Sequence, residues 1–457
     1  MESSRPEATR KLAERIVSIG PEALDETVLV RARQLFLDGL AVALAGTVQE
    51  RPPRMIAEHV RELGGAASSS VIGFGFRTSP VQAAYVNGSS MHVLDFEPMW
   101  SPANHQLSTQ LPAALALAEH LGQDGRTIAL AMVKGIETMG WIRQAAWQSA
   151  PDLVRFHTPG LVGPLGAAVA AGQMLELGAE QLANALGLAA SRTGSLMANA
   201  GTDTKSTHCG LAASLGLDAA MLASRGFTAN TEALEHERGY VAIYHGHEHF
   251  RYELLEQFGP PFRVVSPGYA IKMFPSQYGT HFVITAALAL HARIDDPSRI
   301  RSVHITVPTM PYVNRPRPAT GLDGKFSFQY TTASALLDGR VKMDTFEDTM
   351  RFRPAIEALL DCTEVTMSEA IPATFEHMHV IIKVELDDGT VLEERCAGPK
   401  GKYGTPPVPK DAHLVKVRDC LRLALPEPAI EDVIGLASRL ETLSAEEVKS
   451  LLAILRL

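Results

Sequence analysis

Cysteine is scarce in this sequence, and basic runs are missing from it. The 457 residues include four cysteines, none of them in a CxxC pair: Cys209, Cys362, Cys396 and Cys420. Such scattered cysteines predict neither a disulfide framework nor a zinc site, and they are typical of a reducing cytoplasm. With a net charge of -9 and no Lys- or Arg-rich block, the chain is not expected to bind nucleic acid or an anionic membrane. An anionic substrate would therefore need a local cluster of cations.

Long apolar runs and several well-known motifs are also missing. The longest apolar stretches, such as 161–174, are interrupted by Gly and Pro and fall short of the roughly 20 residues of a membrane span. The N-terminus lacks the basic and apolar regions of a signal peptide. GxGxxG, GxxxxGKS/T and GxSxG do not occur, so nucleotide binding and serine-hydrolase chemistry have no support. We expect a soluble, cytoplasmic protein with no membrane partner.

What the chain has instead is a long series of helical patterns between Glu7 and about Phe258, with little strand-like alternation. Small residues at helical spacing, as in 166–172 and 212–220, allow helices to pack closely. The expected helices are 27–44, 81–91, 111–121 and 127–139, together with the Ala- and Gly-rich segments 163–190 and 211–223. This part of the chain predicts a large all-helical domain.

Near Pro267 the pattern changes to short β-branched or alternating runs. Strands are expected at 303–307, 364–367, 378–386 and 391–395, with a hairpin turn at 387–390. Helices are expected at 272–294 and 326–337, and, after a Gly- and Pro-rich linker, at 412–425 and 445–455. Because the chain exceeds the size of a single core, we expect two domains. The predicted fold class is mainly α, with an all-helical domain at 1–266 and 404–457 and a smaller α+β domain at 267–403.

The segment 201–210 places Lys205, His208 and four hydroxyl groups in an otherwise apolar region. If the segment is helical, the two cationic side chains lie three residues apart on one face. Together with the N–H groups of a helix N-terminus they could bind carboxylates. A solvated turn capped by Thr204 or Ser206 is the alternative, but the apolar flanks favour a site.

Two further segments carry titratable side chains. Asp95 and His105 lie in one loop between helices and could act as a general base and acid if the loop folds them together. The alternative, which spacing alone slightly favours, is that Asp95 caps a helix and His105 is an ordinary loop histidine. Lys272 and His281 flank a Pro-Ser helix start, which is a natural but weakly specific site for an anion.

Three more features have a structural explanation beside a functional one. Tyr312 and Arg315 could bind a carboxylate, although most such loop residues are structural or exposed. His157 stands at a helix start and is more typical of a cap than of a catalyst. The alternate histidines at 245, 247 and 249 suggest a metal only if they lie on a strand. No acidic or cysteine ligands accompany them, so we expect a structural or exposed cluster and no metal.

Several short motifs, in this order, resemble the MmgE/PrpD family, which includes 2-methylcitrate dehydratase, cis-aconitate decarboxylase and iminodisuccinate epimerase. The resemblance runs along nearly the whole chain. Its markers are Asp38-Gly-Leu-Ala-Val-Ala-Leu-Ala-Gly46, Asn87-Gly, His92-Val-Leu-Asp95-Phe, Phe156-His157-Thr158, Gly201-Thr-Asp-Thr-Lys205 with His208, Gly226-Phe-Thr, Lys272-Met-Phe-Pro275 and Tyr312-Val-Asn-Arg-Pro.

The resemblance implies that the α+β domain is a lid over a cleft, that the protein is a homodimer, and that it uses no metal or organic cofactor. The expected catalytic residues are Asp95, His105, Lys205 and Tyr312. The expected substrate-binding residues are His208, Lys272, Gln277, Met99 and His157. Met99 stands where the decarboxylases have threonine, and Gln277 where they have histidine, so we expect a retuned pocket.

The resemblance further implies chemistry that makes or quenches a carbanion beside a carboxylate. The leading hypothesis is a cofactor-independent lyase, a dehydratase or decarboxylase, acting on a small di- or tricarboxylate such as 2-methylcitrate or cis-aconitate. One alternative is an epimerase or racemase of a small dicarboxylate. Another is a non-catalytic helical scaffold, against which the retained acids and cations argue.

Overall fold

The computed structural model describes residues 7–146, 155–399, 401–402 and 408–457. The fold is mainly α with two small sheets, as the sequence predicts. It forms two compact units, each described here by itself. The helical unit comprises the described parts of 1–148 and 155–269, together with 410–457, and the mixed unit comprises the described part of 270–409.

The helical unit consists mostly of α-helices, and one short hairpin, β1 (Ser69–Val71) with β2 (Phe76–Thr78), joins them. The helices of the N-terminal part are α1 (Ala8–Ser18), α2 (Glu26–Gln49), α3 (Arg51–Leu63), α4 (Pro80–Val93), α5 (Leu107–Leu121), α6 (Gly125–Ala145), α7 (Thr158–Met174), α8 (Ala179–Ala190), α9 (Thr204–Ser224) and α10 (Tyr240–Tyr244). Three C-terminal helices belong to the same unit: α16 (Lys410–Leu421), α17 (Glu427–Ala437) and α18 (Ala445–Arg456).

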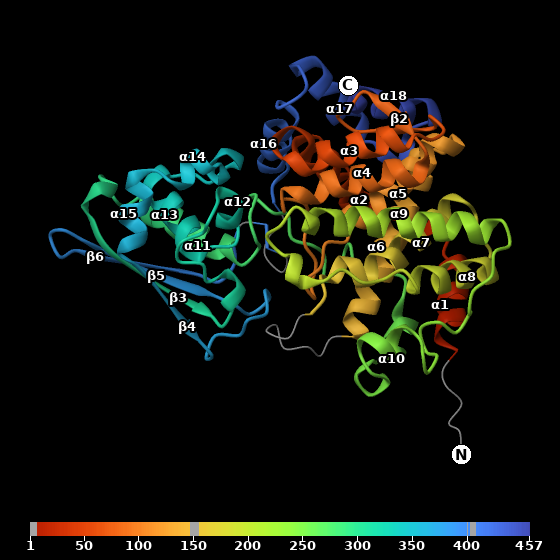
Figure 1. Cartoon of the computed structure of the whole chain (residues 1–457), viewed down its shortest axis with the longest axis horizontal. Helices are drawn as coiled ribbons and strands as arrows, with labels where there is room; N and C mark the ends of the chain where they lie inside the picture. Colours follow the sequence, from red (N-terminus) through yellow and green to blue (C-terminus); the bar gives the residue numbers. More distant parts are fainter. Residues whose placement is uncertain (1–6, 147–154, 400, 403–407) are drawn as a thin grey trace. The chain divides into compact units, whose positions relative to one another are not determined.

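Helix α9 packs along α7 and α4 (Figure 1). The contacts of α9 with these two helices are the most extensive between helices of the unit. Glycines make this close packing possible. A Cβ on Gly210 of α9 would lie 2.2 Å from the carbonyl oxygen of Tyr85 on α4, and one on Gly216 would lie 2.3 Å from that of Pro164 on α7. Because only glycine tolerates such an approach, the Ala- and Gly-rich sequence brings the C-terminal end of α4 to the first turns of α9.

The mixed unit is a four-stranded sheet with helices on one face. Its strand order is β4 (Thr363–Ser368), β3 (Ile300–Pro308), β5 (Val380–Leu386), β6 (Val391–Cys396), with β3 and β4 parallel and the other pairs antiparallel. Alternate residues of β5, from Val380 to Leu386, are buried, as expected for a sheet with one covered face. Helices α11 (Thr280–His291) and α13 (Phe328–Asp338) contact the strands (Figure 1). Shorter helices complete the unit: α12 (Gly321–Gly324), α14 (Asp348–Arg351) and α15 (Pro354–Asp361).

The predicted elements agree with the structure at most places; one predicted helix begins later than expected, and several short elements were not predicted. The hairpin at 387–390 is confirmed, since β5 and β6 pair on either side of it. The helix predicted at 272–294 is wrong in its first part, because α11 begins at Thr280. Pro275 explains the difference, since proline and the residue before it disfavour a helix. The sequence patterns also missed helices α3, α15 and α17, each of which has proline in its first turn, and the three-residue strands β1 and β2.

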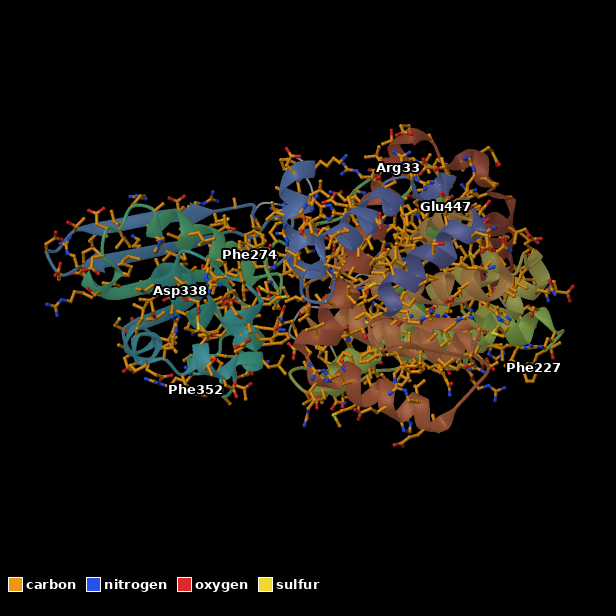
Figure 2. All side chains as sticks on the ribbon, turned by 90° about the horizontal axis from the view of Figure 1, so that it is seen from above. Arg33, Phe227, Phe274, Asp338, Phe352 and Glu447 are labelled. Atoms are coloured by element: carbon orange, nitrogen blue, oxygen red, sulfur yellow. The ribbon has the colours of Figure 1, made fainter. Side chains whose placement is uncertain are left out.

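Side chains that end in nitrogen or oxygen atoms are found over the surfaces of both units, as the sticks of Figure 2 show. On the helical unit, Arg33 Nε donates a hydrogen bond to Glu441 Oε2 at 2.9 Å. On the mixed unit, Arg353 Nη2 donates to Asp338 Oδ2 at 2.6 Å. Among the described helices, none combines the length and the apolar character that crossing a bilayer would require.

Candidate active site

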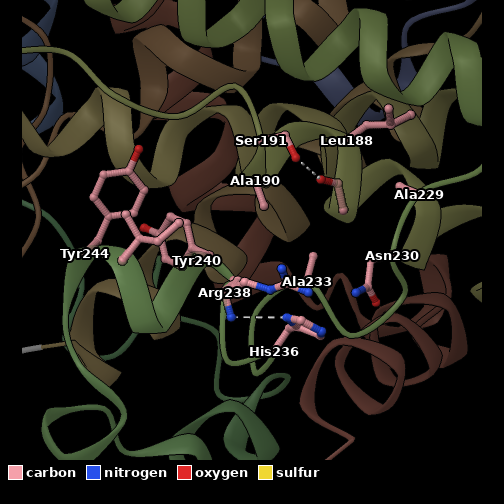
Figure 3. Close-up of a pocket in the computed structure, with 13 residues that line it drawn as sticks. Leu188, Ala190, Ser191, Ala229, Asn230, Ala233, His236, Arg238, Tyr240 and Tyr244 are labelled. Atoms are coloured by element: carbon pink, nitrogen blue, oxygen red, sulfur yellow. Dashed lines mark hydrogen bonds between the residues drawn. The ribbon is translucent and has the colours of Figure 1, made fainter.

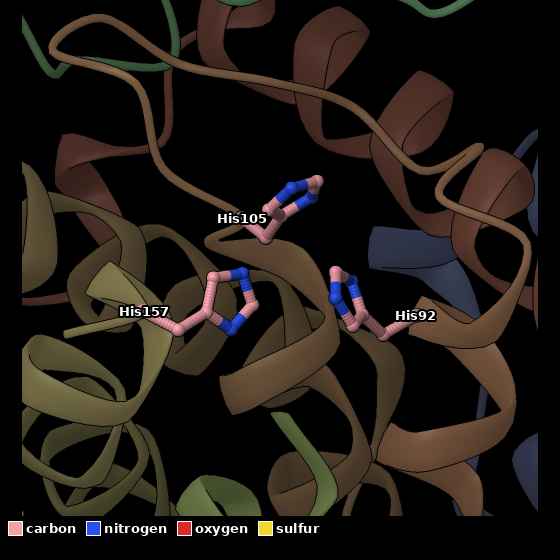
Figure 4. Close-up of side chains that lie close together, drawn as sticks. All are labelled: His92, His105 and His157. Atoms are coloured by element: carbon pink, nitrogen blue, oxygen red, sulfur yellow. The ribbon is translucent and has the colours of Figure 1, made fainter. Parts of the chain in front are cut away.

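Three histidine rings converge in the helical unit, each from a different segment (Figure 4). His92 lies in the last turn of α4, His105 in the loop before α5, and His157 directly before α7. The ring centroids of His92 and His105 are 4.5 Å apart, and those of His92 and His157 are 5.3 Å apart. Asp95 turns the chain between the first two, with a φ of 52° in the left-handed region that Asp tolerates better than most residues.

His92 connects a carboxylate to a cation. Its Nδ1 lies 2.5 Å from Glu97 Oε1, and its Nε2 lies 2.9 Å from the Nζ of Lys205. Burial, followed by the nearby Lys205 charge, lowers the pKa of His92 to about 4. The ring is therefore neutral at pH 7, and its partners set the tautomer. Nδ1–H donates to Glu97, and Nε2 accepts a hydrogen bond from the Lys205 ammonium.

Glu97 is fully buried and holds both histidines of the loop. Its Oε1 lies 2.9 Å from His105 Nδ1 and accepts a hydrogen bond from Ser108 Oγ at 3.1 Å. Burial alone would raise the pKa of Glu97, but the His105 and His92 rings outweigh burial and hold the pKa well below its usual value. A buried carboxylate in this setting fixes the orientation of both rings.

Lys205, Asp95 and His105 form an outer trio. Asp95 Oδ2 is 3.5 Å from Lys205 Nζ, and Asp95 Oδ1 is 3.5 Å from His105 Nε2. The side chains of the trio are 7–13% exposed, whereas those of the inner pair, His92 and Glu97, are 1% and 0% exposed. The outer trio can therefore reach a substrate. The inner pair lies deeper and orients the side chains of the trio. The structure thus brings Asp95 and His105 together, as the general acid–base hypothesis requires.

His157 and His208 lie beside the outer trio. Their Nδ1 atoms are 3.2 Å apart, so one ring donates a hydrogen bond to the other. Burial and then the Lys205 charge lower the pKa of both rings. His157 occupies the N-cap position of α7, but its side chain does not cap the helix. Its ring belongs to the histidine cluster instead.

Lys205 and His208 lie on the first two turns of α9, so the prediction of a helical face is confirmed. The alternative of a turn capped by Thr204 or Ser206 is not found, since the N-cap residue is Asp203 and its side chain makes no cap bond. Met99, in the loop that carries Asp95 and His105, is buried. Its predicted contact with substrate stays a prediction.

The remaining predicted residues lie in the mixed unit. Lys272 is buried, and its Nζ donates to the carbonyl oxygen of Ser276 at 3.2 Å. Gln277 Nε2 donates to the phenol oxygen of Tyr312 at 2.8 Å, so these two predicted residues lie together. Arg315 pairs with Asp323 and with the carbonyl oxygen of Tyr312. The parts of Lys272, Gln277 and Tyr312 in catalysis or binding stay predictions.

Sequence reasoning missed the inner pair. The sequence alone assigns no role to His92 or Glu97, because the contact between them depends on an irregular turn. The signal that could have found them is a histidine and an acid flanking Asp95, at spacings of three and two residues.

Three overlapping groups of side chains have potential metal-ligand atoms within 4.8 Å of one another. These groups are His92, His105 and His157; His92, Glu97 and Cys209; and Asp95, Glu97 and His105. The Lys205 ammonium beside His92 Nε2 opposes a cation at this place. Burial raises the pKa of the Cys209 thiol, which disfavours the thiolate that a metal requires. The arrangement suits an anionic substrate better than a metal ion.

The histidines at 245, 247 and 249 do not lie on a strand. His245 directly follows α10, and the other two belong to a single 3₁₀ turn, with His247 Nδ1 2.8 Å from the Tyr252 hydroxyl. None of the three belongs to a group of potential metal ligands among the described residues. The expectation of a structural or exposed cluster fits this arrangement.

A pocket of about 360 Å³ lies between α8 and the segment 229–244 (Figure 3). Its lining includes Arg238, whose backbone N–H donates to His236 Nδ1 at 3.1 Å. None of the predicted site residues lines this pocket. The chemistry of the histidine cluster therefore identifies the candidate site, and the pocket does not.

The chain matches two family models in succession. The MmgE/PrpD N-terminal domain matches residues 10–253, and the MmgE/PrpD C-terminal domain matches residues 274–441. Cis-aconitate decarboxylase of Mus musculus is 31% identical over 95% of this chain and 91% of its own length. The decarboxylase of Homo sapiens is also 31% identical, over 92% and 89%. 2-Methylcitrate dehydratase of Cupriavidus necator is 27% identical over 79% of each chain.

Proposed function

Since the chain belongs to the MmgE/PrpD family and is a lyase of that type, we propose that its substrate is a small tricarboxylate such as cis-aconitate or 2-methylcitrate. Relatives with both activities match the chain, and the decarboxylases of Mus musculus and Homo sapiens, each 31% identical, match it at higher identity than the 2-methylcitrate dehydratase of Cupriavidus necator, at 27%. We therefore propose decarboxylation of a cis-aconitate-like acid as the leading reaction, without a metal or organic cofactor.

The observation that carries this proposal is the outer trio. A cation, a carboxylate and an imidazole lie in one chain of contacts, with 3.5 Å from Lys205 Nζ to Asp95 and 3.5 Å from Asp95 to His105 Nε2. A lyase of this kind needs a cation to bind a carboxylate and a group that moves a proton. The trio supplies both within the reach of one small molecule.

Lys205 is the proposed anchor for a substrate carboxylate, with His208 of the same helix as a further donor. His92 Nε2 holds the Lys205 ammonium from behind, so the position of the charge is fixed before substrate binds. Such preorganisation favours catalysis because no reorientation has to accompany the reaction. It also explains how a chain with a net charge of -9 can accept a trianion.

His105 and Asp95 are the proposed proton carriers. In decarboxylation, one C–C bond breaks, CO₂ leaves, the electron pair stays on the substrate, and the imidazolium form of His105 delivers its Nε2 proton to carbon and keeps the proton on Nδ1 that faces Glu97. In dehydration, one member of the pair would take a proton from a carbon beside a carboxylate, the C–O bond would break, and the other member would give a proton to the leaving hydroxyl group, which departs as water. Glu97 faces His105 Nδ1 and so directs Nε2 toward Asp95. Positioned acid–base groups of this kind contribute about 10²- to 10⁴-fold.

Gln277 and Tyr312 are proposed to tune the choice of substrate. The family resemblance implies that Gln277 is an amide at a position where the decarboxylases have histidine, and its Nε2 donates to the Tyr312 phenol. A phenol oxygen that accepts from Gln277 directs its own proton elsewhere, and we propose that this proton assists at the substrate. The change removes an acid–base group but keeps a fixed hydrogen-bond donor.

The proposal is tested with purified protein in D₂O and a panel of acids: cis-aconitate, 2-methylcitrate, citrate and small amino- or hydroxy-dicarboxylates. Proton NMR follows each acid. Loss of CO₂ from cis-aconitate supports the leading reaction, and loss of water from 2-methylcitrate supports dehydration. Deuterium exchange at a retained stereocentre would replace the lyase with an epimerase. No change in any acid would contradict the proposal.

We further propose a homodimer in the cytoplasm. The dimer follows from the family resemblance, and light scattering after size exclusion should give twice the chain mass of 49.3 kDa. The four cysteines are free, three of them buried, which supports a reducing compartment. Cell fractionation tests the compartment.

A further inference from the structure

The loop that carries Asp95 and Glu97 is held at the residue between them. Phe96 is buried, and its carbonyl oxygen accepts a hydrogen bond from Lys416 Nζ at 2.8 Å. The same ammonium lies 4.1 Å from the centroid of the Phe96 ring. One side chain therefore contacts both the main chain and the ring of Phe96.

Lys416 is itself held by a buried acid. Asp38 on α2 is 0% exposed, and its Oδ2 accepts from Lys416 Nζ at 3.0 Å. His413, one turn before Lys416 on α16, places Nε2 2.9 Å from Asp38 Oδ1. Burial alone would raise the pKa of Asp38, but Lys416 and His413 reverse that effect and lower it. The ammonium is thus fixed between a carboxylate and the site loop.

We propose that Lys416 and Asp38 form a brace that positions the catalytic loop through the Phe96 carbonyl. The brace joins segments 320 and 378 residues apart in the sequence, because Lys416 reaches Phe96 and Asp38 from α16. It gives the C-terminal helices a part in the reaction without contact with substrate. It also explains why the motif beginning at Asp38 accompanies the active-site motifs in this chain.

A buried ion pair is weak evidence for stability, since a well-packed apolar pair is often at least as stable. The geometry points to a role in positioning the loop rather than in stability. Besides the Asp38 carboxylate, the Lys416 ammonium contacts the main-chain carbonyl of Phe96, which lies between the two site carboxylates Asp95 and Glu97. Asp95 has no regular ladder to hold it, and its N–H donates to the carbonyl oxygen of His92 at 2.8 Å in a turn. A small shift of such a loop would move both carboxylates at once.

The test compares Lys416→Met with Lys134→Met, a matched control. Lys134 is a buried lysine of the same unit whose Nζ donates to Gln173 Oε1 at 2.6 Å, away from the site loop. In Lys416→Met, hydrogen–deuterium exchange of the peptide covering 93–106 should rise by about tenfold or more. In Lys134→Met that peptide should exchange as in the wild type. This readout needs no substrate.

The kinetic part rests on the proposed function. With the acid that the wild type converts, Lys416→Met should lower kcat by about 10- to 100-fold with little change in KM, because a displaced loop loses reactive geometry more than carboxylate binding. Lys134→Met should leave kcat near the wild-type value. If the wild type converts none of the acids, the proposed function fails, whereas the exchange experiment still tests the brace.

The double variant Asp38→Asn/Lys416→Met separates position from stability. In Lys416→Met the buried Asp38 carboxylate loses its ammonium partner, which destabilises the fold. Asp38→Asn removes that buried charge, so the melting temperature of the double variant should recover. The Phe96 carbonyl still lacks its donor, so the fast exchange of 93–106 and the low kcat should persist. Wild-type exchange in this peptide, in either variant, would overturn the proposal. So would a kcat that recovers together with the melting temperature.

Discussion

Lys205 Nζ and His92 Nε2 lie 2.9 Å apart, with the cation on the exposed side and the neutral ring beneath it. The ring can accept from the ammonium because its own proton is on Nδ1, facing Glu97 at 2.5 Å. A buried carboxylate thus fixes the position of a cation two contacts away. The order carboxylate, imidazole, ammonium points positive charge toward the place where a substrate carboxylate would bind.

Asp95 and His105 should behave as one proton-carrying unit. Asp95→Asn and His105→Asn should each lower kcat by about 10²- to 10⁴-fold. The double variant should be little worse than the more damaging single one, because residues that act as a unit are not additive. Steady-state kinetics of the three variants measure this. Additive losses would mean that the two residues act independently.

His92 should remain neutral well below neutral pH. Its pKa is lowered to about 4, by burial first and then by Lys205, so at pH 5.5 the ring should show the neutral Nδ1–H tautomer. NMR of protein labelled with ¹⁵N in histidine distinguishes this tautomer from imidazolium. A His92 signal that titrates near pH 6.5 would contradict the assigned contact with Lys205.

Glu97→Gln should lower kcat by more than the same substitution of another buried glutamate. The amide cannot accept from both His92 and His105 with a full negative charge, so the ring orientations relax and kcat should fall by about 10²-fold. Glu119→Gln is the matched control, since Glu119 is a buried acid of the same unit that accepts from Ser70. If Glu97→Gln and Glu119→Gln lose the same amount of stability and also lose the same factor in kcat, Glu97 does not orient the two histidines.

Glu137 should make stability depend on pH. Burial raises its pKa from 4.5 to about 7, against hydrogen bonds from Arg263 N–H, Trp141 Nε1–H and Gly259 N–H. Between these two pH values the unfolded chain is ionised and the folded chain is not. The contribution of Glu137 is therefore full below pH 4.5 and is lost as the pH rises to 7, by up to about 3 kcal/mol.

Denaturant unfolding of Glu137→Gln at several pH values checks this sign. The variant should gain stability relative to the wild type as the pH rises from 5 to 8. A difference between the two proteins that stays constant over this range would show that the carboxyl is ionised throughout.

Periodicity was sufficient for the fold class and for the helical face that Lys205 and His208 share. Helical patterns rich in Ala and Gly predicted the packing around α9, and the spacing of Lys205 and His208 predicted their shared face. Alternation and the turn at 387–390 predicted the β5–β6 hairpin. These features are local, so a single sequence contains them. Helix 272–294 was extended too far because its apolar pattern outweighed the signal of Pro275.

The rest could not be predicted because it depends on contacts without a period. Glu97 meets His105 through an irregular loop, and its role is visible only once Asp95 has turned the chain. The contact between Asp38 and Lys416 joins residues 378 positions apart. The sequence around either residue does not indicate which residue is its partner. Asp38 was noticed as part of a motif, but a buried acid inside an apolar helix predicts only that some partner exists.

The central claim is that Lys205 anchors a tricarboxylate beside the proton carriers Asp95 and His105. The most direct measurement follows cis-aconitate in D₂O by proton NMR, with the wild type and Lys205→Met side by side. The wild type should release CO₂ and form a product with one deuterium on carbon. The Lys205→Met variant should form no product, although its circular dichroism spectrum should show that it is folded. Conversion by the variant at the wild-type rate would contradict the account.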